Sequence, residues 1–352
     1  MVKHIAVIKG DGIGPEVTSQ AVKILQAIAK KFGHHFEYTE VAMGACAIDL
    51  YGNSLPDETI AVCLKADAIL LGAIGDPKYD LDPNAKIRPE QGLLKLRKTL
   101  KLFTNIRPTT IYPCLAEMSP LKTHKLLGVD FVIYRELTSG IYFGKKEILE
   151  NNDAASDLCY YHLNDIEPIT HLAFKAALTR RKKLCLIDKA NVLETSRLWR
   201  KIVQRIALQY PDVELRFMYV DNAAMQIIVN PAQFDVILTE NMFGDILSDE
   251  ASVLSGSLGL APSASIGNAI ALFEPIHGSY PQAANKNIAN PMAAILSAAM
   301  LLDYFQATKE ANEIRTAVET CLHNGWVTID LNENNYLGTT EVGAKIEQLI
   351  LG

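Results

Sequence analysis

The chain has 352 residues, of which 49% are hydrophobic and 21% are charged, and its formal net charge at pH 7 is −6. This length suggests about two domains, and the composition allows a large core and argues against wholesale disorder. The acidic net charge also argues against nucleic-acid binding. The longest basic run, RRKK at 180–183, is interpreted as a solvated helix end.

The cysteines and the apolar segments predict a cytoplasmic protein without a membrane span. None of the six cysteines forms a Cys-x-x-Cys pair, which favours reduced thiols over a disulfide framework or a zinc site. Residues 1–7 run directly into a strand pattern and lack the longer apolar stretch of a signal peptide. The apolar segment 289–302 is too short to cross a bilayer and is predicted to be a buried helix.

Strand and helix patterns alternate along the chain. Residues 4–8 predict a strand, 15–32 a helix with Pro15 in its first turn, 36–42 a strand, 56–65 a helix and 68–71 a buried strand. Later strands are predicted at 131–134, 184–187, 215–220 and 236–238, and a helix at 192–208. The alternation predicts α/β layering. Residues 76–88 are expected to form a loop, and the turn-rich segment 140–164 an arm.

The segment GDGIGP at 10–15 lies between the first strand and the first helix. It is similar to a dinucleotide-binding fingerprint, but its third glycine comes one residue early and no acidic residue ends the next strand in the expected context. A tight turn before a helix is a sufficient explanation for these residues.

Two carboxylates follow the strand at 234–239 within the segment NMFGDILSD at 241–249. Asp245 and Asp249 are four residues apart and share one face of the predicted helix. Like charges on neighbouring turns repel unless a cation lies between them, and oxygen ligands of this kind suit Mg²⁺ or Mn²⁺. The alternative is a pair of solvated acids near a helix N-terminus, which the helix dipole favours.

Charged residues also stand at the ends of other strands. Lys189, Asp221 and Asp245 each follow a predicted strand, and ligands bind at the carboxyl edge of open α/β sheets. Arg135 directly follows the strand predicted at 131–134, and Arg97 and Arg107 lie in the first third of the chain. The guanidinium group of arginine binds a carboxylate through two parallel hydrogen bonds. Arg97 or Arg107 alone would nevertheless be interpreted as a surface charge.

These motifs identify a resemblance that covers nearly the whole chain. The chain resembles the isocitrate/isopropylmalate dehydrogenase family of β-decarboxylating dehydrogenases and, within it, the 3-isopropylmalate dehydrogenases. The resemblance rests on KGDGIGPE (9–16), PEQGLLKLR (89–97), NIRP (105–108), RELTSGIYFG (135–144), DKANVLE (188–194), NMFGDILSDEASVLSGSLGL (241–260), EPIHGS (274–279) and IANP (288–291).

The resemblance implies a two-domain α/β fold that is not of the Rossmann type, in a homodimer. A discontinuous domain of residues 1–101 and 256–352 would hold the cofactor. Residues 102–255 would hold the substrate and metal and form the dimer contact, with a protruding β-arm near 140–164 at the dimer interface. The two active sites would be shared, because each receives Lys189 and Asp221 from the partner subunit.

The resemblance also implies a role for each site residue. The implied metal ligands for Mg²⁺ or Mn²⁺ are Asp221, Asp245 and Asp249. The implied substrate contacts are Arg97, Arg107, Arg135, Asp221, Glu90, Leu93, Leu94 and Val192. The implied catalytic pair is Tyr142 and Lys189. The implied NAD contacts are Glu274, His277, Gly278, Ser279, Gln282 and Asn290.

The implied reaction is the NAD-dependent oxidative decarboxylation of (2R,3S)-3-isopropylmalate to 4-methyl-2-oxopentanoate and CO₂ in leucine biosynthesis. Lys189 would take the C2 hydroxyl proton, and Tyr142 would protonate C3 after CO₂ leaves. Leu93 and Leu94, with Val192 of the partner subunit, would enclose the isopropyl group, although a Leu-Leu pair on a helix is more often part of a core. The Leu pair also argues against tartrate, malate or homoisocitrate as the substrate.

The chain departs from the family pattern beside the cofactor motif. The family has Ala-Pro-Asp after His-Gly-Ser, whereas this chain has Tyr280, Pro281 and Gln282. NAD is still expected, because no lysine or arginine replaces the missing aspartate and Ala283 follows; the neutral Gln282 predicts weaker rejection of NADP. The segment 330–338 also departs from the usual short glycine-rich pattern.

Two other classes of function compete with this interpretation. A catalytically silent regulatory homologue is disfavoured because Lys189, Tyr142 and the three aspartates are all present. A metal-dependent hydrolase or phosphate-binding module would leave the three arginines and Tyr142 without a role.

Overall fold

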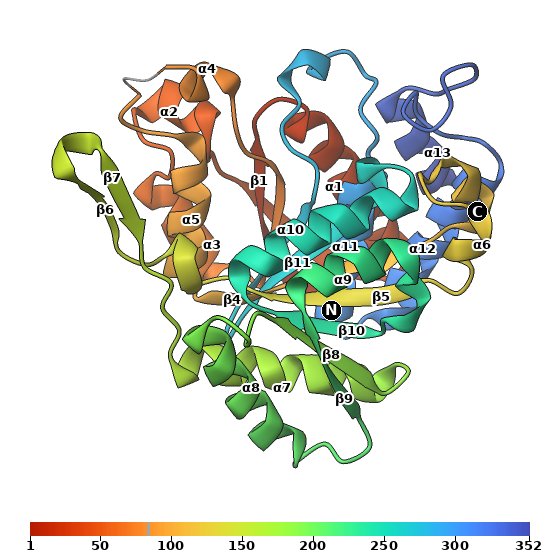
Figure 1. The fold of residues 1–352 in the computed structure, drawn as a ribbon. Helices are drawn as coiled ribbons and strands as arrows, with labels where there is room; N and C mark the ends of the chain where they lie inside the picture. The colour runs from red at the N-terminus through yellow and green to blue at the C-terminus, as the bar shows by residue number, and fades with distance from the viewer. Residues whose placement is uncertain (83–84) are drawn as a thin grey trace. The chain divides into compact units, whose positions relative to one another are not determined.

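The computed structural model of the chain describes residues 1–82 and 85–352, and its backbone contacts divide it into two compact units (Figure 1). Unit 1 consists of Met1–Leu102, Tyr112–Met118 and Gly256–Gly352, and unit 2 consists of Phe103–Ile111 and Ser119–Ser255. The limits expected from the sequence differ from these at Leu102 and at Tyr112–Met118.

Unit 1 has the strand order β2-β1-β3-β12-β11. The β1/β2, β1/β3 and β3/β12 pairs are parallel, whereas β11 and β12 are antiparallel. Its strands are β1 (Val2–Gly10), β2 (His35–Glu40), β3 (Ala68–Ala73), β11 (Pro262–Gly267) and β12 (Ala271–Pro275). Its α-helices are α1 (Gly14–Phe32), α2 (Ala45–Tyr51), α3 (Asp57–Lys65), α4 (Pro77–Asp80), α5 (Pro89–Thr99), α11 (Met292–Tyr304), α12 (Thr308–His323) and α13 (Thr339–Leu351). Short 3₁₀ turns are η1 (Pro113–Met118), η6 (Leu258–Leu260) and η7 (Pro281–Ala283).

The apolar segment predicted to be a buried helix is α11, and that prediction is confirmed. Nearly all of its residues from Met292 to Leu302 are buried, and the helix contacts α1, α12, β11 and β12. A helix that is apolar on all sides belongs in the interior of a protein, and α11 packs there. Within the described part of the chain, no helix combines the length and the apolar character needed to cross a membrane.

Unit 2 has the strand order β4-β5-β10-β8-β9. The β4/β5 pair is antiparallel and the other pairs are parallel. Its strands are β4 (Leu102–Thr110), which belongs to unit 2 from Phe103 onward, β5 (Asp130–Glu136), β8 (Lys183–Asp188), β9 (Glu214–Tyr219) and β10 (Val236–Thr239). Its α-helices are α6 (Thr123–Leu126), α7 (Leu163–Thr179), α8 (Glu194–Ala207), α9 (Val220–Val229) and α10 (Asn241–Ser252), with 3₁₀ turns η2 (Gly140–Tyr142), η3 (Glu150–Asn152), η4 (Pro231–Gln233) and η5 (Val253–Ser255).

The central strands of unit 2 are covered on both faces. On β8, Leu184 and Leu186 join one hydrophobic cluster, while Cys185 and Ile187 join another. Helices α7 and α8 contribute to the first cluster, and α9 and α10 to the second. Successive side chains of a strand point to opposite faces, so a strand buried on both sides is apolar throughout. This arrangement explains the continuous apolar runs of the predicted strands.

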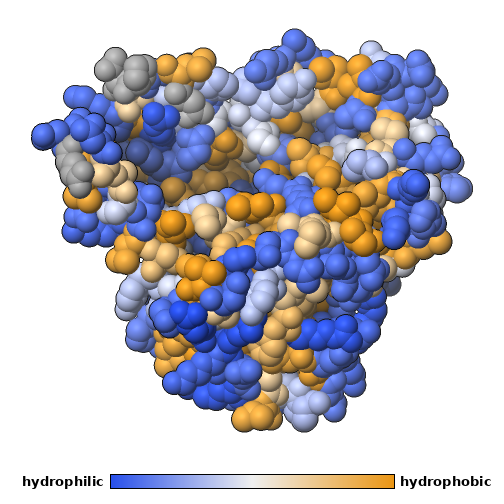
Figure 2. Space-filling view, in the orientation of Figure 1, coloured by the Kyte–Doolittle hydropathy of each residue, from blue (hydrophilic) through white to orange (hydrophobic). Residues whose placement is uncertain are grey.

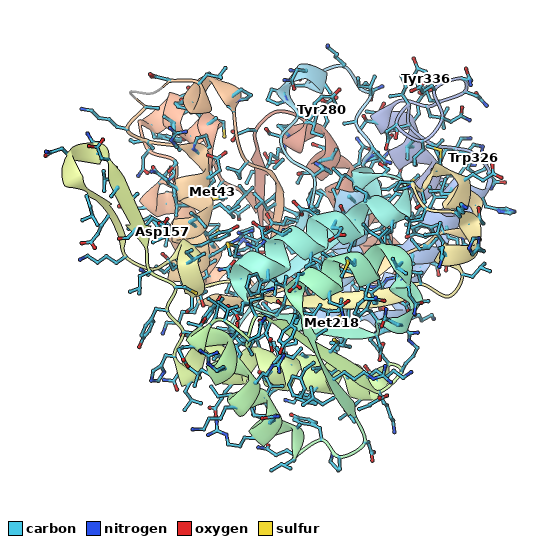
Figure 3. All side chains as sticks on the ribbon, in the orientation of Figure 1. Met43, Asp157, Met218, Tyr280, Trp326 and Tyr336 are labelled. Carbon is cyan, nitrogen blue, oxygen red and sulfur yellow. The ribbon has the colours of Figure 1, made fainter. Side chains whose placement is uncertain are left out.

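Strands β6 (Lys146–Leu149) and β7 (Ala154–Asp157) form a separate antiparallel hairpin. It lies within the segment predicted to be an arm, and Figure 1 draws it as a yellow-green hairpin that stands apart from α7 and α8 of the same unit. Lys146 Nζ donates to Asp157 Oδ1 at 3.0 Å, and Asp157 is labelled in Figure 3. Ile148 is 73% exposed, and Figure 2 shows hydrophobic residues interspersed with hydrophilic ones over this part of the chain.

The predicted alternation of strands and helices is confirmed, with small shifts at the ends of elements. One expectation is wrong in part: the segment expected to be a loop at 76–88 contains the helix α4 (Pro77–Asp80), which begins with Pro77 behind the capping side chain of Asp76. Residues 83 and 84 of that segment lie outside the described residues.

Two buried glutamates lie at the ends of strands in unit 2. Glu136, which ends β5, accepts bonds from the backbone N–H groups of Thr138 at 2.7 Å and Ser139 at 3.0 Å. Glu240 follows β10 and accepts a short hydrogen bond from the hydroxyl of Ser196. Burial raises the pKa of each carboxyl to about 7.

The raised pKa of Glu240 predicts a pH-dependent loss of stability. Between the unfolded pKa of 4.5 and the folded pKa of about 7, the folded chain binds more protons than the unfolded chain, so the free energy of unfolding falls as the pH rises through this window. The contribution of one such group is at most about 1.4 kcal/mol per pH unit. The Glu240→Gln variant keeps an acceptor for the Ser196 hydroxyl. Its free energy of unfolding, measured with urea, should fall less between pH 5 and pH 8 than that of the unmodified chain.

Glu117→Gln is the control, because Glu117 is exposed. It should follow the pH dependence of the unmodified chain. Identical pH dependence in Glu240→Gln and in the unmodified chain would contradict the expectation for the buried carboxyl.

Candidate active site

Helix α10 places Asp245 and Asp249 on one face, as the sequence predicts. The helix begins directly after β10, and Gly244 is the residue that lets it approach β5. A Cβ atom at Gly244 would lie 2.6 Å from Cγ of Arg135, which is closer than carbon atoms pack. The glycine in this motif is therefore explained by the arginine that lies against it.

Arg135 is the buried centre of a cluster formed by five predicted site residues, all in unit 2. The Arg135 side chain is only 5% exposed, and its Nη1 donates a short charged hydrogen bond to Asp245 Oδ1. Its Nε and Nη2 donate to Asn241 Oδ1 at 3.2 and 2.8 Å. The guanidinium is thereby fixed between the end of β5 and the first turn of α10.

Arg107 joins the same helix from β4. Its Nη1 donates to Asp249 Oδ1 and to Ser248 Oγ, each at 2.7 Å, and its Nε donates to Asn105 Oδ1 at 2.8 Å. Its Nη2 lies 4.0 Å from Asp245 Oδ1. The two arginines therefore meet the two carboxylates of α10 side by side.

Tyr142 completes the cluster. Its hydroxyl donates to Asp245 Oδ2 at 2.8 Å, and the Arg135 guanidinium carbon lies 5.8 Å from the centre of its ring. Partial burial, and then the hydrogen bond to Asp245, raise the pKa of Tyr142. The phenol therefore keeps its proton over the neutral range and is able to donate it.

Lys189 and Asp221 form a pair of their own. Lys189 follows β8, Asp221 lies in the first turn of α9, and Lys189 Nζ donates a short charged hydrogen bond to Asp221 Oδ1. This bond lowers the pKa of Asp221. The residues that the structure describes contain no group of three or more His, Cys, Asp or Glu side chains that could hold a metal ion, so Asp221 does not join Asp245 and Asp249 within one chain.

The donor set on α10 fits a hard divalent cation. Asp245 and Asp249 present carboxylate oxygens from adjacent turns of one helix face, and both already contact cationic guanidinium groups. Carboxylate oxygens of this kind suit Mg²⁺ or Mn²⁺, which need a few protein ligands and complete their shell with water or substrate oxygens.

The remaining predicted substrate residues lie elsewhere. Arg97 of α5, in unit 1, donates from Nη2 to Glu274 Oε1 at 2.8 Å, and its buried Nε has no partner among the described residues. Glu90 of the same helix lies beside Gly75. Leu94 is 37% exposed, and Val192 of unit 2 is 61% exposed. The alternative that the Leu93-Leu94 pair belongs to a hydrophobic core is therefore wrong for Leu94, which is exposed.

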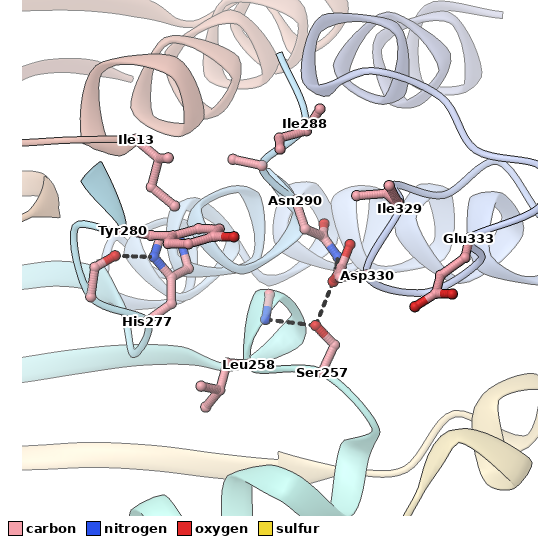
Figure 4. A pocket seen from close by; sticks show the side chains of 13 residues that line it. Ile13, Ser257, Leu258, His277, Tyr280, Ile288, Asn290, Ile329, Asp330 and Glu333 are labelled. Atoms are coloured by element: carbon pink, nitrogen blue, oxygen red, sulfur yellow. Dashed lines mark hydrogen bonds between the residues drawn. The ribbon is translucent and has the colours of Figure 1, made fainter. Parts of the chain in front are cut away.

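Unit 1 contains a cavity of about 450 Å³ beside the EPIHGS motif (Figure 4). Three predicted cofactor residues line it, His277, Gly278 and Asn290, whereas Glu274, Ser279 and Gln282 do not. The other lining residues are Ile13, Ser257, Leu258, Gly259, Tyr280, Ile288, Ala289, Ile329, Asp330 and Glu333.

An unpartnered nitrogen in this cavity fits a ligand with hydroxyl or amino donors. His277 Nδ1 donates to the carbonyl of Gly278 at 3.0 Å, which makes Nε2 the acceptor in the neutral ring, and burial lowers the pKa of His277. Nε2 is buried and has no partner among the described residues. Asp330 Oδ2 accepts from Ser257 Oγ at 2.6 Å and Asn290 Nδ2 at 3.1 Å. The cavity thus suits the adenosine half of a dinucleotide.

Sequence reasoning did not assign Ile13, Tyr280 or Asp330 to this cavity. The sequence signals that could have pointed to Tyr280 and Asp330 were the departures from the family pattern at 280–282 and 330–338. In the structure, both residues line the cavity. Ile13 comes from the turn between β1 and α1, and only the fold places this turn beside residue 279, through a 2.7 Å hydrogen bond from Ile13 N to the carbonyl of Ser279.

Comparisons with known proteins agree over nearly the whole chain. The family model described as isocitrate/isopropylmalate dehydrogenase matches residues 4–346. A 3-isopropylmalate dehydrogenase of Priestia megaterium is 52% identical over 99% of this chain and 96% of its own length, and one of Wolinella succinogenes is 55% identical over 93% and 91%.

Solved structures show the same fold. The crystal structure of isocitrate dehydrogenase from Methylococcus capsulatus superposes with a TM-score of 0.89 at 33% identity and covers 99% of this chain and 100% of that one. A β-decarboxylating dehydrogenase from Thermococcus kodakarensis, in its apo form, gives a TM-score of 0.82 at 36% identity, with 99% and 96% covered. On this evidence the chain belongs to the isocitrate/isopropylmalate dehydrogenase family.

Proposed function

We propose that the chain is an NAD-dependent dehydrogenase that converts (2R,3S)-3-isopropylmalate to 4-methyl-2-oxopentanoate and CO₂, in the leucine biosynthesis of the cytoplasm. The observation that carries the proposal is the linked cluster of two arginines, two aspartates and a tyrosine on α10, β4, β5 and η2. Relatives about 50% identical over nearly their full lengths are named for this activity.

The arginines supply the recognition of a dicarboxylate. Arg107 and Arg135 already face carboxylates, and in this proposal their guanidinium groups also bind the carboxylates of the substrate. Arg97 adds a third guanidinium, whose buried Nε lacks a partner among the described residues. Three planar forks fix the two carboxylates and leave the C2 hydroxyl and C3 in a defined position.

The isopropyl group is enclosed by apolar side chains that are open to solvent in the single chain. Leu94 and Val192 are 37% and 61% exposed, and Leu93 is half-buried. Covering them with a branched alkyl group removes apolar surface from water, which favours 3-isopropylmalate over malates that lack the group. Glu90, next to Gly75, closes the pocket against the nicotinamide.

Each proton transfer is assigned to one side chain. When bound, NAD would supply the acceptor for the hydride of C2, and a divalent cation held by Asp245 and Asp249 would supply positive charge near the C2 oxygen. Lys189, in its neutral amine form, takes the proton of the C2 hydroxyl, directly or through a water. After CO₂ leaves, Tyr142 donates its proton to C3. The raised pKa of Tyr142 keeps this proton on the phenol until it is needed.

The active site is assembled from two subunits in this proposal. Lys189 and Asp221 are paired with each other, and Asp221 does not gather with the two aspartates of α10 within the described part of the chain. In a homodimer, Lys189, Asp221 and Val192 of the partner subunit complete the site. The β6–β7 hairpin, with Ile148 exposed, supplies an apolar contact for the second subunit.

The cofactor assignment follows from charge. Among the described residues that line the cavity with His277, Gly278 and Asn290 there is no lysine or arginine to pair with a 2′-phosphate. Glu274, Ser279 and Gln282 stand in the surrounding segment, and Gln282 is exposed on η7. NAD is therefore the preferred cofactor, and NADP is rejected only weakly because Gln282 carries no charge.

A substrate panel tests the proposed function. We expect steady-state turnover of 3-isopropylmalate with NAD in the presence of Mn²⁺ or Mg²⁺, and its loss after treatment with a chelator. A substrate without the isopropyl group should lose at least about tenfold in kcat/KM, because even one methylene contributes about 1–3 kcal/mol to discrimination. Robust turnover of tartrate, malate or homoisocitrate without turnover of 3-isopropylmalate would overturn the substrate assignment.

Lys189→Ala should lower kcat by about 10²–10⁴, because it removes the general base. Binding of NADH, followed by fluorescence, should stay intact. Lys201→Ala, which changes an exposed lysine of α8, is the matched control and should keep its activity. A near-normal rate in Lys189→Ala would remove this residue from the base role.

Mixing the Lys189→Ala variant with a Tyr142→Phe variant tests whether the active site is shared between two subunits. A mixed dimer has one site with both Tyr142 and Lys189 if the two residues come from different subunits. Activity should therefore return after the inactive variants are dissociated and reassociated together, and no recovery would place both residues in one chain.

Gln282→Asp should sharpen the cofactor preference. A carboxylate at this position repels the 2′-phosphate of NADP and accepts hydrogen bonds from the ribose hydroxyls of NAD. The ratio of kcat/KM for NAD to that for NADP should rise at least about tenfold, which corresponds to about 1.4 kcal/mol. An unchanged ratio would show that residue 282 does not face the ribose.

A further inference from the structure

Tyr280 is an exposed aromatic residue held in an unusual backbone conformation on the wall of the unit 1 cavity. Its φ and ψ are 37° and 63°, in the left-handed region, and 57% of its surface is exposed. Bulky residues seldom adopt this conformation, which persists only where the surrounding structure imposes it. Figure 4 shows the Tyr280 ring beside His277 and below Ile13.

The loop that carries Tyr280 is fixed on both sides. The carbonyl of Ser279 accepts a 2.7 Å hydrogen bond from Ile13 N, and the carbonyl of Tyr280 accepts one of 3.0 Å from Ala283 N. A Cβ atom at Gly12 would lie 1.9 Å from the Ser279 carbonyl oxygen, so this close approach requires glycine. The backbone that carries the ring is therefore held in place before any ligand binds, and binding orders little of the loop.

The chemistry of the cavity suits a flat, neutral ring that carries hydrogen-bond donors. Ile13, Ile288 and Ile329 give it apolar walls, and His277 Nε2 is a buried acceptor without a partner among the described residues. Of the lining residues that the structure describes, Asp330 and Glu333 are charged and none is a lysine or arginine. The apolar walls and the unpartnered acceptor fit a purine with an amino group.

We propose that the Tyr280 ring is a stacking wall for the adenine base of the cofactor, and this inference rests on the proposed use of NAD. The residue stands two positions before Gln282, where the chain lacks the acidic contact to the ribose. Stacking on Tyr280 supplies affinity for the adenosine half that a neutral Gln282 does not. Aromatic stacking is indifferent to a 2′-phosphate, so it leaves the weak rejection of NADP in place.

Three substitutions separate the ring from the backbone conformation. Tyr280→Phe keeps the ring and removes the hydroxyl. Tyr280→Ala removes the ring and retains the strained backbone, whereas Tyr280→Gly removes both the ring and the strain, because glycine adopts positive φ readily. Tyr51→Ala, at an exposed tyrosine of α2 that does not line the cavity, is the control.

Direct binding is measured by calorimetry with NAD, ADP-ribose and nicotinamide mononucleotide. We expect Tyr280→Ala and Tyr280→Gly to raise the Kd for NAD and for ADP-ribose about tenfold, and Tyr280→Phe and Tyr51→Ala to leave both near the original value. The Kd for nicotinamide mononucleotide should not change in any variant.

Three outcomes would overturn the stacking role: unchanged affinity for ADP-ribose in both truncations, a loss confined to Tyr280→Ala, or an equal loss for nicotinamide mononucleotide. The second of these would assign the effect to backbone strain, and the third to the other half of the cofactor. Failure of the unmodified chain to bind NAD or ADP-ribose would instead refute the cofactor assignment itself.

Discussion

The ion pair between the buried Arg135 and the partly exposed Asp245 is the interaction on which the unit 2 cluster depends. Arg135 is almost fully enclosed, and a buried charge left without its partner costs about 3–5 kcal/mol. The pair, with the two hydrogen bonds to Asn241, fixes the end of β5 to the first turn of α10. Arg107 and Tyr142 then attach to carboxylates whose positions are already set.

The charge balance of this cluster explains how it accommodates its proposed ligands. Two guanidinium groups face two carboxylates, and Lys189 faces Asp221, so each set is neutral in the single chain. A divalent cation and a dicarboxylate substrate bring equal and opposite charges. Their joint binding therefore preserves neutrality, whereas either alone leaves an uncompensated charge in a partly buried place.

Much of the unit 2 site was predictable from the sequence. The spacing of Asp245 and Asp249 fixed their shared helix face, and the strand ends located Arg135, Lys189 and Asp221. Local patterns carry no information on which residues pair, so the pairing of Lys189 with Asp221 and the two contacts of Arg107 appeared only in the structure.

The cavity of unit 1 was less accessible to sequence reasoning. Its walls come from the turn at Ile13, the loop at Tyr280 and the distant segment at Asp330, which no periodicity connects. The sequence also gives no sign of the left-handed backbone conformation at Tyr280, because residues with a bulky side chain seldom adopt it. The family resemblance supplied His277 and Asn290 here, and the residues where the chain departs from the family had to be placed by the fold.

The position of β10 in unit 2 has a consequence for biosynthesis. This strand lies between β5 and β8 but is made after both, so a nascent chain exposes two unpaired apolar edges until residues 236–239 leave the ribosome. Unit 1 has a similar delay, because β12 borders β3 but is encoded about two hundred residues later. The growing polypeptide therefore depends on protection of these edges during much of translation.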